Sequence, residues 1–266
     1  KHGGKLDRPG SRGSSTANSR RRRTVDPHRN ETAHHPEADQ PPPVGERRWK
    51  HLTSRQRQNH WRQTCACAQS HRRQAFERIE RTEALGGVSR MQIAPEQGEF
   101  LSTLTALLAP SFVVEIGTFT GYSALAIARE LVPPATLLCC DVSEEWTAIA
   151  REHWEAAGVD DRIELKIAPA IETMRSLPGD TVIDMAFIDA DKGGYVDYYE
   201  ALVTRLAPRG VILIDNTLWS GTVADEANQE HSTIAIRELN RHVAADSRTR
   251  QVVLPVGDGL TMVTLS

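Results

Sequence analysis

The chain has 266 residues, 39% of them hydrophobic, and a formal net charge of −3. No stretch approaches the roughly 18 consecutive apolar residues of a membrane-spanning helix, and the first residues lack the apolar segment of a secretory signal. The four cysteines occur as Cys65-x-Cys67 and Cys139-Cys140, spacings that match neither a zinc knuckle nor a C-x-x-C redox pair. These features predict a cytoplasmic protein with free thiols and no membrane partner.

The first part of the chain differs from the rest in charge and hydrophobicity. Residues 1–75 hold 17 Lys and Arg against 6 Asp and Glu, and only 14 of these 75 residues are apolar. Residues 76–266 hold 15 basic against 29 acidic residues. Because so few apolar residues cannot offset the entropy of ordering a core, we predict a basic, disordered tail over 1–69 and one domain over 70–266. The alternative for the tail is an arm that binds nucleic-acid phosphates through its Arg20–Arg23 run.

Beyond the tail, apolar runs alternate with amphipathic stretches. A polar helix is expected from about residue 69 to the Gly86-Gly87 pair. A second helix opens at Pro95, where a missing N–H costs nothing, and its apolar residues recur at helical spacing as far as Leu108. Strands are predicted at 111–117, 135–141, 162–168, 181–189 and 210–215, with helices at 121–132, 143–158, 169–177, 195–207 and 231–246. The last two predicted strands, 250–256 and 260–265, form a hairpin around Gly257-Asp258-Gly259.

Apolar strands that alternate with helices indicate an α/β fold, in which a mostly parallel sheet is covered by helices on both faces. Ligands of such sheets bind beyond the carboxyl ends of the strands. The unusual polar residues of this sequence follow the predicted strands at those ends, so we expect the functional site there.

The first predicted strand runs into Glu115-Ile-Gly117-Thr-Phe119-Thr-Gly121. Phe119 stands where the G-x-G-x-x-G motif has its second glycine, which disfavours a dinucleotide. Glu115 suits a cationic or amine-bearing ligand rather than a phosphate. Asp141 ends the next predicted strand, where a carboxylate can accept both hydroxyls of a ribose. Together these residues predict S-adenosylmethionine; the alternative is an ordinary strand–helix turn with a capping acid.

A second polar group follows the fourth and fifth predicted strands, as Asp189-Ala-Asp191-Lys192 and Asp215-Asn216. If these strands are neighbours, Asp189, Asp215 and Asn216 converge. Oxygen donors without His or Cys suit a hard cation such as Mg²⁺, Mn²⁺ or Ca²⁺. The alternative is two unrelated turns with capping side chains. On spacing alone, Lys192 is either a solvated loop charge or a proton acceptor beside the metal.

Several motifs give the chain a resemblance to a known family. They are RMQIAPEQGEFL, VVEIGTFTGYSALAIA, CDVSEEWTAIA, IELKIAPA, FIDADKGGY, GVILIDNTLWSG and PVGDGL. Over roughly residues 76–266 the sequence resembles the cation-dependent O-methyltransferases, the caffeoyl-CoA and catechol O-methyltransferase group, and its bacterial members more than its plant members. The resemblance implies a Rossmann-like, doubly wound sheet of seven strands with the last strand antiparallel, and a homodimer.

The resemblance also implies roles for residues at matching positions. S-adenosylmethionine would be held by Ile93, Glu115, Gly117, Thr118, Ser123, Asp141, Ala170 and Asp191. The divalent cation would be held by Asp189, Asp215 and Asn216, and Lys192 would be the catalytic base. Trp219, just after the metal pair, is a candidate wall for an aromatic acceptor or a plain core residue.

The sequence departs from the plant enzymes at two positions that border the substrate. Plant members carry Thr where Ile93 stands and Asn where Ser220 stands, and the family's first helix has no clear counterpart before Ser70. The predicted reaction is methyl transfer from a sulfonium to a phenolic oxygen of a vicinal diol, because two adjacent hydroxyls can chelate one cation. The rival hypothesis is a nucleic-acid-binding protein that uses the basic tail, although the acidic domain would repel phosphates.

Overall fold

The computed structural model describes Thr82 and residues 85–266 of the chain. The predicted tail over residues 1–69 and nearly all of the polar helix expected before Gly86 lie outside the described residues. Gly86 has a positive φ of 74° and begins the 3₁₀-helix η1 (Gly86–Met91).

Helices and strands alternate along the described chain, as the hydrophobic pattern predicted. The α-helices are α4 (Pro95–Leu108), α5 (Tyr122–Ala128), α6 (Glu144–Ala157), α7 (Ala170–Ser176), α8 (Tyr195–Val203) and α9 (His231–Ala245). The strands are β1 (Phe112–Ile116), β2 (Thr136–Asp141), β3 (Ile163–Ile167), β4 (Ile183–Ile188), β5 (Leu206–Ile214), β6 (Thr249–Leu254) and β7 (Leu260–Leu265). Further 3₁₀-helices are η2 (Asp160–Arg162), η3 (Lys192–Gly194) and η4 (Trp219–Ala224).

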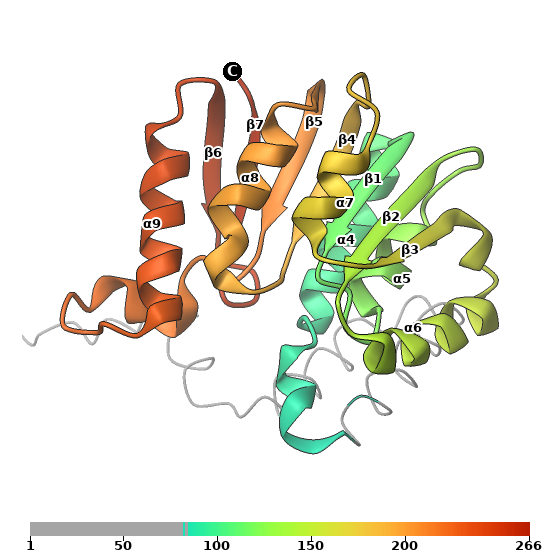
Figure 1. Ribbon diagram of the computed structural model, residues 1–266, viewed down its shortest axis with the longest axis horizontal. Coiled ribbons are helices and arrows are strands. Elements are labelled where there is room, and N and C mark those ends of the chain that lie inside the picture. The colour runs from blue at the N-terminus through green and yellow to red at the C-terminus, as the bar shows by residue number, and fades with distance from the viewer. Residues whose placement is uncertain (1–81, 83–84) are drawn as a thin grey trace, which may run out of the picture. The chain divides into compact units, whose positions relative to one another are not determined.

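These strands form one seven-stranded sheet in the order β3-β2-β1-β4-β5-β7-β6 (Figure 1). The first five pair in parallel, whereas β7 is antiparallel to both of its neighbours, β5 and β6. The strand order reverses between β1 and β4, which is the switch point where open α/β sheets bind ligands. The predicted α/β, Rossmann-like, doubly wound fold with an antiparallel last strand is therefore confirmed.

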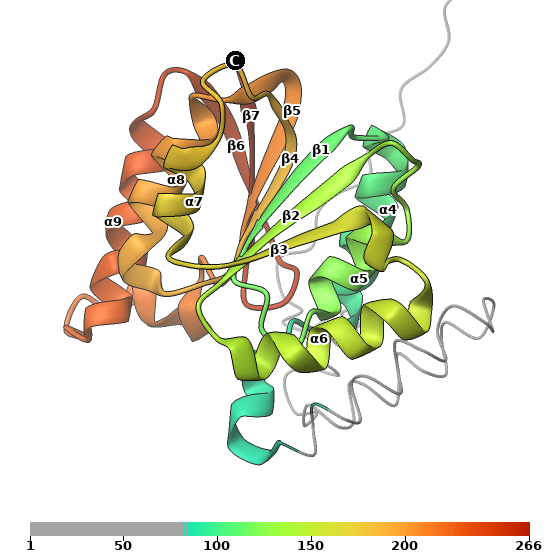
Figure 2. The same cartoon turned by 45° about the vertical axis from the view of Figure 1, so that its right-hand side comes forward.

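Helices cover both faces of the sheet, with α4, α5 and α6 on one face and α7, α8 and α9 on the other (Figure 2). Successive side chains of β1 point to opposite faces of the sheet. Val113 packs on the face covered by α4, α5 and α6, and Val114 packs on the face covered by α7, α8 and α9. Both side chains are fully buried. Burying such a side chain is worth roughly 1.5–3 kcal/mol, which explains why β1 is apolar at nearly every position.

The helix that follows β2 begins and ends as predicted. The Ser143 hydroxyl accepts a hydrogen bond from the Trp146 amide. Glu144 and Glu145 lie in the first turn, where the positive end of the helix dipole stabilises their negative charges. Gly158 ends the helix in the left-handed conformation, with φ 65°.

Two predicted helices were too long at their ends. The helix expected over 121–132 ends at Ala128. The helix expected over 195–207 ends at Val203, and β5 begins at Leu206 rather than at residue 210. Leu206 already pairs with Ile183, and the register then shifts before Met185 pairs with Val211. A bulge of this kind disguises the start of a strand, since it breaks the run of apolar residues that marks a strand in the sequence.

In the described part of the chain, no helix is long and apolar enough to cross a membrane.

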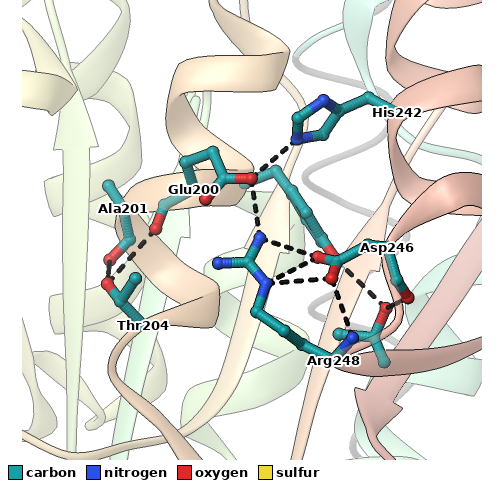
Figure 3. Close-up of polar contacts among 8 residues, drawn as sticks. Glu200, Ala201, Thr204, His242, Asp246 and Arg248 are labelled. Atoms are coloured by element: carbon teal, nitrogen blue, oxygen red, sulfur yellow. Dashed lines mark hydrogen bonds and ion pairs between the residues drawn. The ribbon is translucent and has the colours of Figure 1, made fainter.

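A charged cluster ties α8 and α9 to the start of β6, at the edge of the sheet opposite the carboxyl ends of the parallel strands (Figure 3). Glu200 Oε1 lies 2.6 Å from His242 Nε2 and 2.7 Å from an Arg248 Nη2. Asp246 accepts from the same guanidinium at 2.7 Å and from the Tyr199 hydroxyl at 2.7 Å. Hydrogen bonding to Arg248 holds the pKa of both carboxyls below their usual values.

Replacing Asp246 by asparagine is expected to destabilise the domain by about 1 kcal/mol, a small value because Arg248 is nearly half exposed. An acid with a depressed pKa stabilises the fold above its unfolded pKa and loses that effect as the pH falls through the folded value. The melting temperature of the variant should therefore lie a few degrees below wild type at pH 7, with the gap closing below about pH 4. The exposed Asp180 supplies the control, Asp180→Asn; an equal loss there would contradict a specific role for Asp246.

Candidate active site

The turn after β1 lies directly against neighbouring elements, and its glycines make this possible. Gly117 has φ 90°, and a Cβ added there would lie 2.0 Å from the carbonyl oxygen of Asp189. Gly121 has φ 77°, and its Cβ would lie 2.7 Å from the side chain of Ala150 on α6. A larger residue at either position would push the turn away from Asp189 or Ala150. The two glycines therefore fix the position of the turn that borders the predicted cofactor site.

Asp141, at the end of β2, braces this turn. Its Oδ2 accepts the amides of Thr118 and Phe119 at 2.9 and 2.8 Å, and its Oδ1 accepts the amide of Ser143 at 2.8 Å. Asp141 does not cap either neighbouring helix, because α6 is capped by Ser143 and α5 begins after Gly121. A carboxylate has about four acceptor positions, so Oδ1 can still receive another donor. The ribose contact of Asp141 stays a prediction.

Glu115 is fully buried beneath the turn. Its Oε2 accepts from the Cys139 thiol at 3.4 Å, across the β1–β2 pairing. Burial raises the pKa of Glu115 to about 7, and hydrogen bonding from Ser123 and Cys139 opposes the rise. Within the described residues, Glu115 Oε1 and the hydroxyl of Thr118 are buried without a hydrogen-bond partner. Buried polar atoms of this kind are costly unless a ligand or water completes them.

The ends of β4 and β5 lie side by side, as the metal hypothesis required. Ile188 pairs with Ile214, and the Asp215 amide donates to the Ile188 carbonyl at 2.9 Å. Asp215 is 2% exposed, and the next residue, Asn216, has a left-handed φ of 60°. A non-glycine residue held in this conformation is uncommon and occurs often at functional sites.

Lys192 joins these two strand ends. Its Nζ lies 3.1 Å from Asp189 Oδ1, 2.7 Å from Asn216 Oδ1 and 2.6 Å from the Tyr195 hydroxyl. These three acceptors match the three protons of an ammonium group. The Trp219 ring centroid lies 5.4 Å from the same Nζ, within the range of a cation–π contact.

The two carboxyls at these strand ends require a nearby positive charge. Burial raises the pKa of Asp189, and the Lys192 charge opposes that rise. Burial and the charge of Asp189 raise the pKa of Asp215 to about 7. A buried carboxyl beside a half-buried one that repels it is characteristic of sites that bind a cation or share a proton.

The other predicted cofactor residues are distributed around the turn. Ser123 lies buried in the first turn of α5, and Ala170 is the buried first residue of α7. Ile93, between η1 and α4, is 8% exposed. The hydrogen bonds of Asp191 go to the Gly194 amide and the Tyr198 hydroxyl rather than to another predicted site residue.

The acceptor side is less buried. Ser220 is exposed, and its amide donates to Asp258 Oδ1 at 2.7 Å, in the β6–β7 hairpin. Trp219 is partly buried against the core on the α7–α9 face, and its ring lies beside Lys192; its role as a wall for the acceptor stays a prediction.

Sequence reasoning missed two side chains of this site. Tyr195 follows Lys192 by three residues, a spacing that brings side chains together on a helical turn and could have indicated the contact. Cys139 contacts Glu115 only because β1 and β2 pair in this register, which the sequence does not display.

No cluster of three or more His, Cys, Asp or Glu side chains with metal-binding spacing occurs among Thr82 and residues 85–266. The candidate cation site instead combines two carboxylates with one amide oxygen. Oxygen ligands of both kinds hold Mg²⁺ and Ca²⁺ in proteins.

Comparisons with known proteins identify the family of the chain. A family model described as "O-methyltransferase" matches residues 67–265. A Dictyostelium discoideum protein described as "Probable caffeoyl-CoA O-methyltransferase 1" is 42% identical over 173 residues, which are 64% of this chain and 75% of that protein. "Caffeoyl-CoA O-methyltransferase 2" of Zea mays is 36% identical over 182 residues, or 65% and 69% of the two chains.

Solved structures share the fold. The Podospora anserina methyltransferase PaMTH1, bound to S-adenosylhomocysteine (SAH), is 27% identical with a TM-score of 0.66, covering 73% of this chain and 88% of that one. The Streptomyces achromogenes O-methyltransferase TomG, in complex with S-adenosylmethionine (SAM), is 24% identical with a TM-score of 0.67, covering 72% and 89%. The chain therefore belongs to the O-methyltransferase family, the S-adenosylmethionine-dependent enzymes that its motifs predicted.

Proposed function

We propose that this enzyme methylates a hydroxyl of a catechol-like small molecule, with the help of a divalent cation. The observation that carries the proposal is the convergence of Asp189 Oδ1 and Asn216 Oδ1 on one positively charged atom, Lys192 Nζ, at 3.1 and 2.7 Å. Because these two oxygens already surround the positive charge of Lys192, they are suited to bind a metal ion between the ends of β4 and β5. We take Mg²⁺ as the first choice, with Mn²⁺ and Ca²⁺ as alternatives.

The cation would be held by Asp189, Asp215 and Asn216. When bound, a divalent cation lowers the pKa of a chelated hydroxyl, and S-adenosylmethionine supplies an electrophilic methyl group. The protein's own contribution is to hold and orient the reactants. Lys192 would accept the hydroxyl proton, and Trp219 would hold the aromatic ring of the acceptor beside it.

S-adenosylmethionine would lie over the β1 turn. The buried and unpartnered oxygens of Glu115 and Thr118 offer it hydrogen-bonding groups, and the Asp141 carboxylate keeps one acceptor position. Ile93, Ser123, Ala170 and Asp191 would complete this site, as the motif resemblance implies. The SAH-bound structure of the related PaMTH1 supports S-adenosylmethionine as the cofactor.

A panel of acceptors tests the proposal. Purified enzyme is incubated with S-adenosylmethionine, Mg²⁺ and either catechol-bearing compounds or matched monophenols, and methylated products are measured by mass spectrometry. We expect turnover of the vicinal diols and little turnover of monophenols, which cannot chelate a cation through two oxygens. Equal turnover of both classes would rule out chelation as the basis of acceptor choice.

Replacing Asp141 by asparagine is expected to weaken S-adenosylmethionine binding about ten- to a hundredfold, because a charge-assisted hydrogen bond is worth roughly 1.5–3 kcal/mol. We also expect a modest loss of thermal stability in this variant, because Asp141 accepts the amides of Thr118 and Phe119 in the turn after β1. Calorimetric titration gives the affinity. Asp184→Asn is the matched control, because Asp184 likewise accepts two backbone amides, those of Ser111 and Phe112, at the far end of β1. Equal affinity loss in both variants would place the ribose contact elsewhere.

The proposal further takes the enzyme to be a cytoplasmic homodimer that acts on a small phenolic acceptor rather than on nucleic acid. The buried free thiols of Cys139 and Cys140 are in keeping with a reducing compartment. Sedimentation of the purified full chain tests the dimer.

A further inference from the structure

The loop after Asn216 carries Trp219 in an unusual backbone conformation. Trp219, Ser220 and Gly221 have φ values of 46°, 53° and 82°, three consecutive residues in the left-handed region. Two of them are not glycine, so this conformation costs energy, and it persists only where surrounding groups enforce it.

One of these surrounding groups is the β6–β7 hairpin. Asp258 Oδ1 accepts the Ser220 amide at 2.7 Å, and the Asp258 carbonyl accepts the Leu218 amide at 3.1 Å. The Leu218 side chain also fills the place where a Cβ on Gly259 would lie. The hairpin therefore fixes the first half of the loop from one side.

The second half of the loop is fixed by Arg237, which lies on α9. Its Nε donates to the Val223 carbonyl at 3.0 Å and its Nη1 to the Asn228 carbonyl at 2.8 Å. Its Nη2 donates to the Thr222 carbonyl at 3.1 Å and also to the Asp225 carbonyl. The three nitrogens of one guanidinium thus hold four backbone carbonyls within seven residues, a planar fork of donors that lysine cannot reproduce.

This arrangement connects α9 with the reaction centre. In Figure 1 the loop (orange, around η4) lies at the amino-terminal end of α9, beside the carboxyl edge of the sheet. The Thr222 hydroxyl donates to the Trp219 carbonyl at 2.8 Å, and the Trp219 ring lies 5.4 Å from Lys192 Nζ. Arg237 is thus linked to Trp219 through one residue, and through Trp219 to Lys192.

We propose that Arg237 is a positioning residue for the acceptor: it holds the segment 219–228 so that Trp219 stays beside Lys192, and it thereby sets affinity and selectivity for the aromatic ring. Arg237 itself does not touch the reactants. The part of this proposal that concerns the acceptor rests on the proposed function, whereas the part that concerns the loop does not.

The experiment compares wild type with Arg237→Met, which keeps the apolar stem and removes all donors, and with Arg237→Lys, which restores one charged donor group. Arg162→Met is the matched control, because Arg162 also donates to two backbone carbonyls, those of Ala128 and Leu131, but on the other face of the sheet. For each full-length protein we measure hydrogen exchange of peptides covering 217–228, the affinity for S-adenosylmethionine, and kcat and KM over the catechol panel.

In Arg237→Met we expect faster exchange confined to 217–228, a rise of about tenfold or more in KM for the acceptor, and S-adenosylmethionine affinity within about twofold of wild type. Arg237→Lys should lie between the two, and Arg162→Met should leave KM unchanged. Unaltered exchange in 217–228, or faster exchange with an unaltered KM, would overturn the proposal. If wild type methylates no catechol, the proposed function fails on its own, and the exchange measurement still decides whether Arg237 holds the loop.

Discussion

Removal of divalent cations is expected to abolish methylation of a catechol. Asp189, Asp215 and Asn216 are too few ligands to hold a hard cation tightly against water, so EDTA should strip the ion, and added Mg²⁺ or Mn²⁺ should restore activity. Turnover is measured by mass spectrometry on protein whose metal content has been determined by elemental analysis. Full turnover by metal-free protein would leave Asp189 and Asp215 as turn caps that share a proton.

The same argument predicts that Asp215→Ala cannot be restored by added cation, because one of two carboxylate ligands is gone. Asp215 also accepts the Asn216 amide at 2.7 Å, so Asp215→Asn is the better test of the charge alone, since the asparagine oxygen can keep that bond. Both variants should lose Mn²⁺ binding in calorimetric titration. Asp184→Asn serves again as control and should bind Mn²⁺ like wild type; parallel loss in that variant would contradict a local effect.

Much of the fold could be predicted because each signal is local. Strand β1 is apolar at nearly every position since both of its faces are buried, and α6 begins at Ser143 and ends at Gly158 because those residue types satisfy helix ends. The two candidate ligand groups could be placed at one edge of the sheet because parallel strands bring their carboxyl ends together.

The parts that escaped prediction depend on contacts between distant residues. Asp141 braces the amides of Thr118 and Phe119, more than twenty positions earlier in the chain. Arg237 donates to backbone carbonyls, and because every residue has one, these acceptors cannot be recognised from the sequence. The start of β5 was hidden by the register shift between Ile183 and Met185. In each case the partner is a backbone group or a register, and neither can be seen in a hydrophobic pattern.

Lys192→Ala is expected to lower turnover by about 10²–10⁴, the usual contribution of a general base. In the structure Lys192 donates to Asp189, Asn216 and Tyr195, as a charged ammonium does. Two of these acceptors are the proposed cation ligands. A cation on the same oxygens would compete with the Lys192 side chain for them. Metal binding and the action of Lys192 as a base should therefore depend on each other.

This coupling predicts a result for Lys192→Ala that differs from the result for a variant without a metal ligand, such as Asp215→Asn. Without the competing ammonium, Lys192→Ala should bind Mn²⁺ at least as tightly as wild type while its turnover falls, whereas Asp215→Asn should lose both. Lys166→Ala is the control, because Lys166 pairs with Glu164 on the exposed β3, and the substitution should change neither quantity. The decisive measurement is Mn²⁺ affinity by calorimetry alongside kcat. Weaker Mn²⁺ binding in Lys192→Ala would show that Lys192 supports the cation site rather than competing with it, and near wild-type turnover would assign the proton transfer to another group.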